Sequence, residues 1–279
     1  MVKLRIGFVG LGNLGGPVAT RIVQAGWPLA VWARRPEVLT PLVSLGATPV
    51  GDLVGLGRSA DIVGILVTDA DDIAEVLDGG LLEGMTRGGV IVIHSTVLPE
   101  ACERFGELAA RQGIQTLDAP LCGGSRAAVI GQIVIPVGGD ADQYDRCLPM
   151  LEAFGGFIRH VGPLGSGQCF KLMYNLLYTA NVEIIMDALD VGERAGLNRG
   201  ALGEMFSMLP YTGYVGSMLA TGTAGAAAVA HGRSMLVKDV DYALRMLKGA
   251  GVDPGSIGRL GVAGLESLKR YLPCETIDD

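Results

Sequence analysis

A glycine-rich turn near the N-terminus constrains the fold more than any other feature of this sequence. Gly10, Gly12 and Gly15 form a Gly-x-Gly-x-x-Gly pattern between a predicted strand at Leu4–Val9 and a helix-compatible segment at Pro17–Ala25. The first glycine permits a tight strand-to-helix turn, the second lets the backbone approach a pyrophosphate, and the third lets the helix pack close to the strand. The N-terminus of that helix favours phosphate groups. The pattern predicts a dinucleotide-binding site, and a glycine-rich turn without a ligand is the alternative.

The end of the second predicted strand, Leu29–Ala33, indicates which dinucleotide binds. An NAD site usually carries an Asp or Glu about 20 residues after the glycines, but Arg34 and Arg35 stand here instead. Because a guanidinium presents a planar fork of donors, the arginines favour the 2′-phosphate of NADP; solvated surface charges are the alternative. We therefore predict NADP as the cofactor. Its predicted contacts are Gly10, Leu11, Gly12, Asn13, Leu14, Gly15, Arg34, Arg35, Val67 and Thr68.

The composition argues against several classes of protein. Apolar residues make up 49% of the 279 residues and charged residues only 18%, which favours a large core and subunit contacts. The net charge of −7 and the lack of a basic tract argue against nucleic-acid binding. The nearest candidate for a membrane span, Leu172–Val191, is interrupted by acidic residues. We expect no signal peptide, because the first apolar run is the predicted nucleotide-binding strand. The five cysteines are scattered. We expect a cytoplasmic protein with reduced thiols and no metal.

Short segments rich in Val and Ile alternate with helical segments over about the first 160 residues. The predicted strands are Leu4–Val9, Leu29–Ala33, Ile62–Val67, Val90–Ile93, Thr116–Asp118, Ile133–Val137 and Phe157–His160. This alternation predicts an α/β fold, with an N-terminal Rossmann-type doubly wound parallel sheet.

The character of the sequence changes after a Gly- and Pro-rich stretch at residues 162–167. A nearly unbroken helical pattern runs from Gln168 to Arg194, and helices are predicted at 201–209, 213–221, 234–249 and 255–271. Residues 224–228 are expected to form a loop or a helix start. We predict a nucleotide-binding domain at residues 1–162 and an all-α substrate and oligomerisation domain at 163–279, joined by a long interdomain helix. A substrate is expected to bind in a cleft between the two domains.

Lys171 is the first candidate for a catalytic role. It lies near the start of the long helix, with Asn175 one turn later on the same face and Tyr178 extending that face. A lysine on a mostly apolar helix is costly unless it has partners or faces water, and partial burial can make it a general acid or base. A first-turn lysine whose amine reaches solvent is the alternative.

Three further segments carry polar groups that could bind a ligand. Ser95 and Thr96 follow a predicted strand, where ligands bind in open α/β sheets, although they also suit a helix N-cap. The segment from Asp118 to Ser125 also follows a strand, and its glycine pair could offer backbone N–H groups to a carboxylate. The third is the pair Lys238 and Asp239, which by itself is most often a solvated pair.

These segments, in this order, resemble the β-hydroxyacid dehydrogenase family, whose members include 3-hydroxyisobutyrate dehydrogenases and several semialdehyde reductases. The resemblance covers nearly the whole chain. The family's G-F-I-G-L-G-x-M-G run is matched at residues 7–15, with Leu14 in place of Met. Its G-x-G-x-x-x-K-x-x-N-N element is matched with Tyr174 in place of the first Asn, and its late K-D element is also present. Its D-x-S-T element has Ile93 in place of the acid, and its D-A-P-V-S-G-G element has Cys122 in place of Ser.

The resemblance implies a role for each of these residues. Lys171 would be the general acid in reduction, and Asn175 would position it. The residues expected to bind the substrate are Ser95, Cys122, Gly123 and Gly124. Thr96 and Lys238 would contact the nicotinamide end of NADP. The family also implies a homodimer or homotetramer.

We therefore predict an NADP-dependent dehydrogenase of a small 3-hydroxy acid or its semialdehyde. Because a thiol is a weaker donor than a hydroxyl, Cys122 favours a substrate somewhat different from 3-hydroxyisobutyrate. Imine reduction on a similar scaffold is an alternative, although such relatives usually carry Asp or Tyr at the position of Lys171. A non-catalytic NADP-binding module is another. Three further residues could either pack in the core or line the predicted cleft between the domains: Tyr211, Tyr214 and His231.

Overall fold

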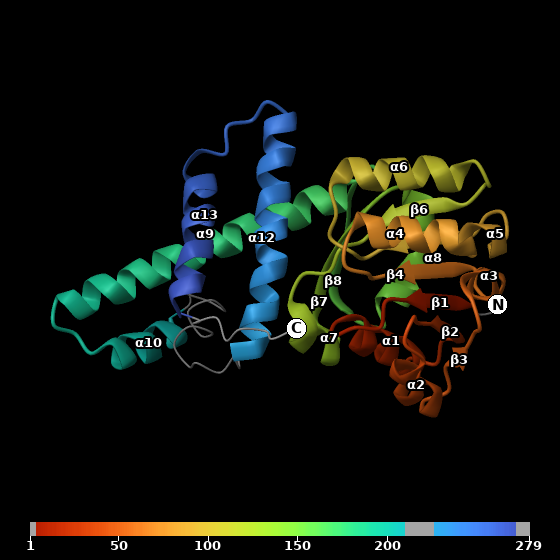
Figure 1. Ribbon diagram of the computed structural model, residues 1–279, viewed down its shortest axis with the longest axis horizontal. Helices are drawn as coiled ribbons and strands as arrows, with labels where there is room; N and C mark the ends of the chain where they lie inside the picture. Colours follow the sequence, from red (N-terminus) through yellow and green to blue (C-terminus); the bar gives the residue numbers. More distant parts are fainter. Residues whose placement is uncertain (1–3, 210–225, 272–279) are drawn as a thin grey trace. The chain divides into compact units, whose positions relative to one another are not determined.

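The computed structural model describes residues 4–209 and 226–271, and the chain divides into two units, Met1–Lys171 and Leu172–Asp279 (Figure 1). The predicted boundary between residues 162 and 163 stays a prediction. One eight-stranded sheet forms the first unit, in the order β3-β2-β1-β4-β5-β6-β7-β8. Its strands are β1 (Ile6–Val9), β2 (Leu29–Trp32), β3 (Thr48–Pro49), β4 (Ile62–Ile65), β5 (Val90–Ile93), β6 (Gln115–Asp118), β7 (Ile133–Gly138) and β8 (Gly155–Gly162). The predicted α/β fold is confirmed, and the short edge strand β3 is an addition that the sequence did not reveal.

Helices cover both faces of this sheet. They are α1 (Gly15–Gln24), η1 (Pro36–Leu39), α2 (Thr40–Ser44), α3 (Leu53–Arg58), α4 (Ala70–Val76), η2 (Leu77–Leu81), α5 (Leu82–Gly84), α6 (Pro99–Ala110), α7 (Gly124–Val129) and α8 (Ala141–Leu151). Successive residues of a strand point to opposite faces, so Phe8 joins the cluster that packs with α1 and α8, whereas Val9 joins the cluster that packs with α3 and α6. A strand that is buried on both faces has apolar residues at successive positions, which explains why the sequence of β1 is apolar throughout.

One ladder departs from the predicted parallel sheet, because β6 pairs antiparallel with β7. The connecting helix α7 has six residues. At about 1.5 Å per residue it spans only about 9 Å, which is too short to return the chain along the strand. The chain therefore enters β7 beyond the carboxyl end of β6, and the last residues of the two strands, Asp118 and Gly138, are paired. The other ladders, including β7 with β8, are parallel.

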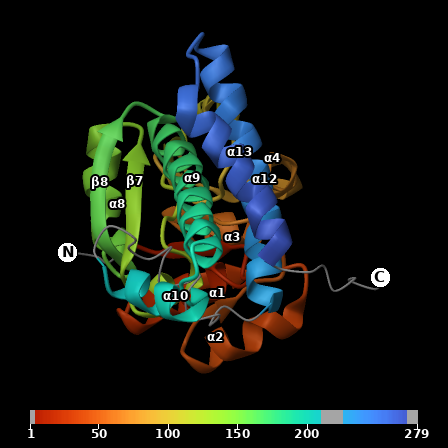
Figure 2. The same cartoon turned by 90° about the vertical axis from the view of Figure 1, so that its left-hand side faces the viewer.

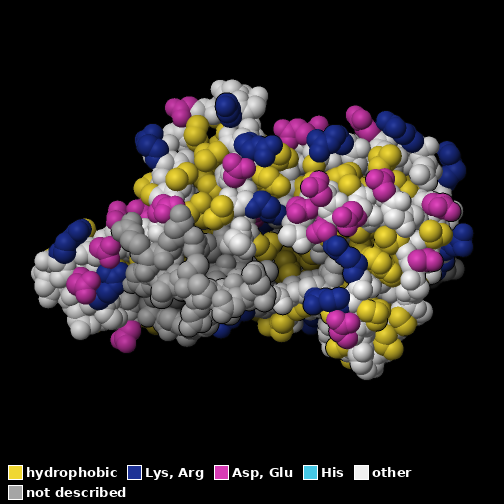
Figure 3. All heavy atoms as spheres, in the orientation of Figure 1, with side chains coloured by type: hydrophobic (Ala, Val, Ile, Leu, Met, Phe, Trp, Pro, Cys, Tyr) yellow, Lys and Arg dark blue, Asp and Glu magenta, His cyan; other side chains and the backbone are white. Residues whose placement is uncertain are grey.

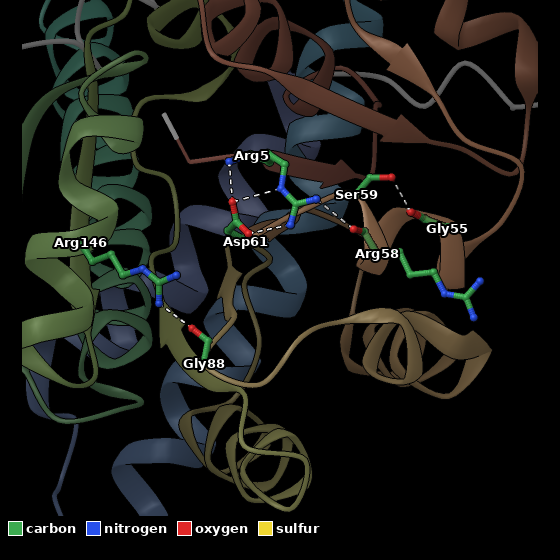
Figure 4. A network of polar contacts seen from close by, with 7 residues as sticks. All are labelled: Arg5, Gly55, Arg58, Ser59, Asp61, Gly88 and Arg146. Atoms are coloured by element: carbon green, nitrogen blue, oxygen red, sulfur yellow. Dashed lines mark hydrogen bonds and ion pairs between the residues drawn. The ribbon is translucent and has the colours of Figure 1, made fainter. Parts of the chain in front are cut away.

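The amino ends of the central strands are held by a polar network (Figure 4). Arg5, just before β1, donates from its backbone nitrogen and its guanidinium to the carboxylate of Asp61, just before β4. The same guanidinium donates to the carbonyl of Arg58, and Arg146 donates to the carbonyl of Gly88, just before β5. This network stabilises the edge of the sheet that lies opposite the carboxyl ends of these parallel strands.

Only helices occur in the described part of the second unit, and α9 enters it from the first. They are α9 (Ser166–Arg194), α10 (Arg199–Met208), α12 (Ala226–Gly249) and α13 (Gly255–Tyr271). Figures 1 and 2 show α12 and α13 side by side. The expected long helix is confirmed, and α12 begins earlier than the predicted residue 234, so residues 226–228 start a helix. The predicted helix at 213–221 lies outside the described residues.

Candidate active site

The segments singled out in the first unit follow the carboxyl ends of its strands. The glycine turn follows β1, Val67 and Thr68 follow β4, and Ser95 and Thr96 follow β5. The strand order reverses between β1 and β4, because the chain leaves β1 toward β2 and returns to β4 on the other side. In open α/β sheets a ligand binds at such a switch point, outside the carboxyl ends of the strands. This edge of the sheet is the candidate active site.

The glycine turn has the shape that a pyrophosphate requires. Gly10 has a φ of +92°, and a Cβ there would lie 2.0 Å from the carbonyl oxygen of Leu66. A Cβ on Gly15 would lie 1.8 Å from the carbonyl oxygen of Gly10, so α1 can start only with glycine there. A Cβ on Gly12 would meet nothing within 4 Å. Packing therefore explains the first and third glycines, whereas the second borders open space that a dinucleotide could fill.

The start of α1 also fits an anionic ligand. Its N-cap residue, Leu14, has no side chain that could accept from the first-turn N–H groups. Such groups are satisfied by a cap, by water or by a ligand, and the helix dipole favours an anion. The residues present thus fit a dinucleotide cofactor.

The two arginines after β2 lie at the surface. Arg34 is paired with carboxylates of α4, because its Nη2 lies 2.5 Å from Oδ1 of Asp72 and its Nη1 lies 3.5 Å from Oε2 of Glu75. The other carboxylate oxygen of Asp72 accepts from the backbone nitrogen of Thr68 at 3.2 Å. Arg35 is exposed. Sequence reasoning missed Asp72 and Glu75, although the acidic start of α4, directly after β4, was a visible signal.

The Ser95 hydroxyl has a structural partner, because its oxygen accepts from the backbone nitrogen of Val67 at 2.8 Å. This bond joins the end of β5 to the end of β4 and places two predicted ligand residues in contact. Ser95 is 1% exposed and Thr96 is 8% exposed. Their predicted roles in binding substrate and cofactor stay predictions.

The third predicted segment follows β6. Cys122 forms an isolated antiparallel bridge with Val134, with two backbone hydrogen bonds of 3.0 Å, and its side chain is buried. Gly123 and Gly124 follow with φ values of +125° and +70°, which only glycine adopts readily. Backbone N–H groups in such a turn can face an anion.

Lys171 lies in the second turn of α9 and is half-buried. Its Nζ donates to the carbonyl oxygen of Leu121 at 2.8 Å, which brings the amine to the segment after β6. Both residues of this contact belong to the first unit. The catalytic role of the lysine stays a prediction.

Asn175 and the Lys238–Asp239 pair belong to the second unit. Asn175 Nδ2 donates to Oδ2 of Asp239 at 2.6 Å, and both side chains are buried. Sequence reasoning gave Asp239 no role, although its place directly after Lys238 was a signal. Lys238 is mostly buried, and its Nζ lies 3.9 Å from the other oxygen of Asp239.

Two buried titratable side chains, His94 and Asp118, lie at the carboxyl ends of β5 and β6. His94 stacks on Phe8, and its Nδ1 donates to the carbonyl oxygen of Ala119 at 2.8 Å. Burial lowers the pKa of His94 to about 4, although that hydrogen bond opposes the shift. Burial raises the pKa of Asp118 to about 6, opposed by backbone N–H groups at the start of α9. At neutral pH the imidazole is therefore neutral and the carboxylate is largely ionised.

Other sequence-based expectations concern absences. Within residues 4–209 and 226–271 no helix is long and apolar enough to cross a membrane, and no group of His, Cys, Asp and Glu could hold a metal ion. On the face of the first unit drawn in Figure 3, acidic and basic side chains are interspersed. The cytoplasmic location and the lack of a nucleic-acid partner stay predictions. Tyr211 and Tyr214, the side chain of His231, and Cys274 lie outside what the structure describes.

A family model described as the NAD-binding domain of 6-phosphogluconate dehydrogenase matches residues 5–162. The 3-hydroxyisobutyrate dehydrogenase of Pseudomonas aeruginosa is 34% identical over 203 residues, which cover 72% of this chain and 68% of that protein. The NAD-dependent L-serine dehydrogenase of the same organism is 33% identical over 204 residues, with 72% and 68% covered.

A solved structure of 3-hydroxyisobutyrate dehydrogenase from Mycobacterium tuberculosis with L-serine has a TM-score of 0.80 to this chain. It is 22% identical, and the match covers 97% of this chain and 94% of that one, which shows a common fold. The family model spans more than half of the chain, and the 34% identity covers more than two thirds of both sequences. The chain therefore belongs to the β-hydroxyacid dehydrogenase family and is an oxidoreductase with an NAD(P)-binding domain.

Proposed function

We propose that the chain is an NADP-dependent enzyme that interconverts a small 3-hydroxy acid and its semialdehyde, with Lys171 as the general acid and base. The observation that supports this most is the place of the lysine amine, 2.8 Å from the carbonyl oxygen of Leu121. That carbonyl lies at the carboxyl-end edge of the sheet, where the glycine turn also lies. A proton donor and a dinucleotide site thus share one edge of the first unit.

The cofactor preference rests on this chain's own residues, since one relative is named as NAD-dependent. An acid at the end of β2 would accept hydrogen bonds from the ribose hydroxyls of NAD. Here the chain continues from β2 into Ala33, Arg34 and Arg35. The exposed guanidinium of Arg34 can turn toward a 2′-phosphate, for which its fork of donors is suited.

The substrate class follows from the relatives and from the segment after β6. 3-Hydroxyisobutyrate and L-serine, which appear in the names of the relatives, both carry a hydroxyl on the carbon next to the one that bears the carboxylate. The backbone N–H groups of Gly123 and Gly124 can bind such a carboxylate, with Ser95 and Cys122 as further predicted contacts. A small hydroxy acid would then place its hydroxyl near the Lys171 amine.

A bound nicotinamide cofactor would supply the hydride in reduction and would accept it in oxidation. In reduction, the protonated Nζ of Lys171 donates its proton to the carbonyl oxygen of the semialdehyde. In oxidation, the neutral amine takes the proton of the hydroxyl. The resemblance to the family assigns the positioning of that amine to Asn175, whose Nδ2 donates to Asp239 within the second unit.

Lys171→Ala tests the catalytic assignment. Removal of a general acid typically lowers the rate by about 10² to 10⁴. We expect that loss in kcat, with the Kd for NADPH measured by fluorescence within twofold of the parent. Lys248→Ala, which removes an exposed lysine at the end of α12, is the matched control and should keep full activity. Full turnover by Lys171→Ala would refute the assignment.

A substrate panel tests the rest of the proposal. Small aldehyde acids and 3-hydroxy acids are assayed with NADPH and NADH, beside cyclic imines. Turnover of one or more acids with a higher kcat/KM for NADPH is the expected result. A preference for NADH would refute the cofactor assignment, and turnover of imines alone would favour an imine reductase. Tight NADPH binding with no turnover at all would indicate a binding module.

A further inference from the structure

We propose that Asp118 and Gln168 form a positioning pair that fixes the start of α9 and thereby the place of the Lys171 amine. The inference rests on the proposed role of Lys171. Both side chains are fully buried, and both are polar. Their hydrogen bonds go to backbone groups at the start of α9 and in the segment after β5.

Asp118 caps the first turn of α9 from outside the helix. It is the last residue of β6, and its Oδ1 accepts from the backbone nitrogen of Gly165 at 2.7 Å. Its Oδ2 accepts from the backbone nitrogen of Gln168, also at 2.7 Å. The first N–H groups of a helix have no partner within the helix, and a carboxylate there is favoured by the helix dipole. Because β6 lies inside the sheet, this cap ties the helix to a rigid element.

Gln168 ties the same turn to the end of β5. Its Oε1 accepts from the backbone nitrogen of Val97 at 3.2 Å, and its Nε2 donates to the carbonyl oxygen of Ser95 at 2.9 Å. The Ser95 hydroxyl in turn accepts from the backbone of Val67. The start of α9 is therefore linked, through one glutamine, to the segments after β5 and β4.

Two glycines let the helix approach the sheet closely enough for these bonds. A Cβ on Gly167 would lie 2.8 Å from the carbonyl oxygens of Asp118 and Pro136. A Cβ on Gly138 would lie 2.2 Å from Oδ1 of Asp118. The first turn of α9 thus rests directly on strand backbone, which leaves it little freedom to slide.

Lys171 follows Gln168 by three residues, so its amine moves with this turn. A slip of the helix by one residue would rotate Lys171 by about 100° and shift it by about 1.5 Å. A misplacement of about 1 Å can cost about 10² in rate. The pair does not supply a group to the reaction; it sets the geometry in which the lysine amine meets the substrate.

Asp118→Asn and Gln168→Met test this role. The amide introduced by Asp118→Asn would set an N–H group against a backbone N–H group, and the methionine would keep the volume of Gln168 without its hydrogen bonds. We expect each variant to lower kcat at least tenfold, while the Kd for NADPH stays within twofold. Asp140→Asn is the control, because Asp140 caps α8 through the backbone nitrogens of Asp142 and Gln143. It should keep kcat within twofold.

A double-mutant comparison separates positioning from general stability. If the pair acts through Lys171, Asp118→Asn should lower the residual rate of Lys171→Ala no further. An equal loss in both backgrounds, or unchanged kcat in both single variants, would overturn the inference. If Asp118→Asn does not fold, the test is made with Gln168→Met alone. If neither variant folds, the pair is needed for folding rather than for positioning Lys171, and the proposal is wrong. Full activity of Lys171→Ala would instead refute the proposed function.

Discussion

At the scale of single residues, the ion pair between Arg34 and Asp72 bears on cofactor affinity. Arg34 must release Asp72 or share its guanidinium to bind a 2′-phosphate. An exposed ion pair contributes about 0.2 to 1 kcal/mol. Asp72→Asn should therefore tighten NADPH binding by at most about fivefold and leave NADH binding unchanged.

Fluorescence titration of both cofactors measures this effect. Glu37→Gln, which removes an exposed carboxylate of η1, is the matched control. If Asp72→Asn weakened NADPH binding instead, the carboxylate would be holding Arg34 in the binding orientation rather than competing for it. A parallel change with NADH would show that neither role concerns the 2′-phosphate.

His94 makes stability depend on pH. Its folded pKa of about 4 lies below the ordinary value of 6.5, because the buried imidazole is hard to protonate. The unfolded chain therefore binds more protons between these values. The stabilisation is complete above about pH 6.5 and is lost as the pH falls toward 4, by at most about 3 kcal/mol.

His94→Gln tests the pH effect by urea unfolding at pH 7 and pH 4.5. The glutamine can still donate to the carbonyl of Ala119, but it does not titrate. The stability difference between parent and variant should narrow as the pH falls. Equal slopes for parent and His94→Gln would contradict the assignment.

The candidate site shows what the sequence could reveal at this scale. The glycine turn and Lys171 could be found because each stands at a recognisable place, after a strand or near a helix start. Gln168 could not be assigned, because its partner Val97 lies 71 residues away in the sequence. A single sequence carries no signal for such pairings.

At the scale of elements, two glycines of α13 set the distance between α13 and α9. A Cβ on Gly264 would lie 1.9 Å from the carbonyl oxygen of Thr179, and one on Gly261 would lie 2.4 Å from Leu176. Gly264→Ala should push the helices apart and lower the stability of the second unit by about 1 to 3 kcal/mol. Thermal unfolding of the full chain measures the loss.

Gly249→Ala is the matched control, since a Cβ at the end of α12 would meet nothing within 4 Å. Alanine favours the helix over glycine, so this variant should be neutral or slightly more stable. If Gly264→Ala were as stable as Gly249→Ala, the close approach of the two helices would not be needed.

Some helices and strands can be predicted from the sequence more accurately than others. The strand Val90–Ile93 and the helix Gly255–Tyr271 have the predicted bounds, because an apolar run defines the strand and a Gly- and Pro-containing break precedes the helix. The strand β3 has two exposed residues and no apolar pattern, so only its pairing with β2 reveals it. Likewise, the antiparallel ladder at β7 depends on the short length of α7, which the local composition does not fix.

At the scale of the whole molecule, one exposed face of α9 carries an apolar seam. Its members recur with spacings of four and three residues, as in a helix that pairs with another helix. They are Phe170, Tyr174, Leu177, Asn181, Ile184, Ala188 and Val191. The four large apolar side chains at intervals of seven, Phe170, Leu177, Ile184 and Val191, are 46 to 55% exposed. The seam spans three heptads, which is long for a helix face left in water.

We expect a second copy of this chain to cover the seam. Paired copies of one helix bury the same residues on both sides, and a polar Asn within an apolar seam can fix the register of such a pair. The homodimer or homotetramer expected from the family would then be built on α9. The proposed interface predicts that a charge in the middle of the seam separates the subunits, because an unpaired buried charge is costly.

Ile184→Glu is the test, with Met205→Glu as the control on α10, where an apolar side chain is exposed outside the seam. Sedimentation velocity of the parent and of Met205→Glu should give a dimer or a larger assembly. Ile184→Glu should shift the protein to the monomer at the same concentration, with its thermal midpoint measured to show that the subunit is still folded. A parent that is monomeric at micromolar concentration would exclude the seam as a subunit interface. Dissociation by Met205→Glu but not by Ile184→Glu would place the interface on α10 instead.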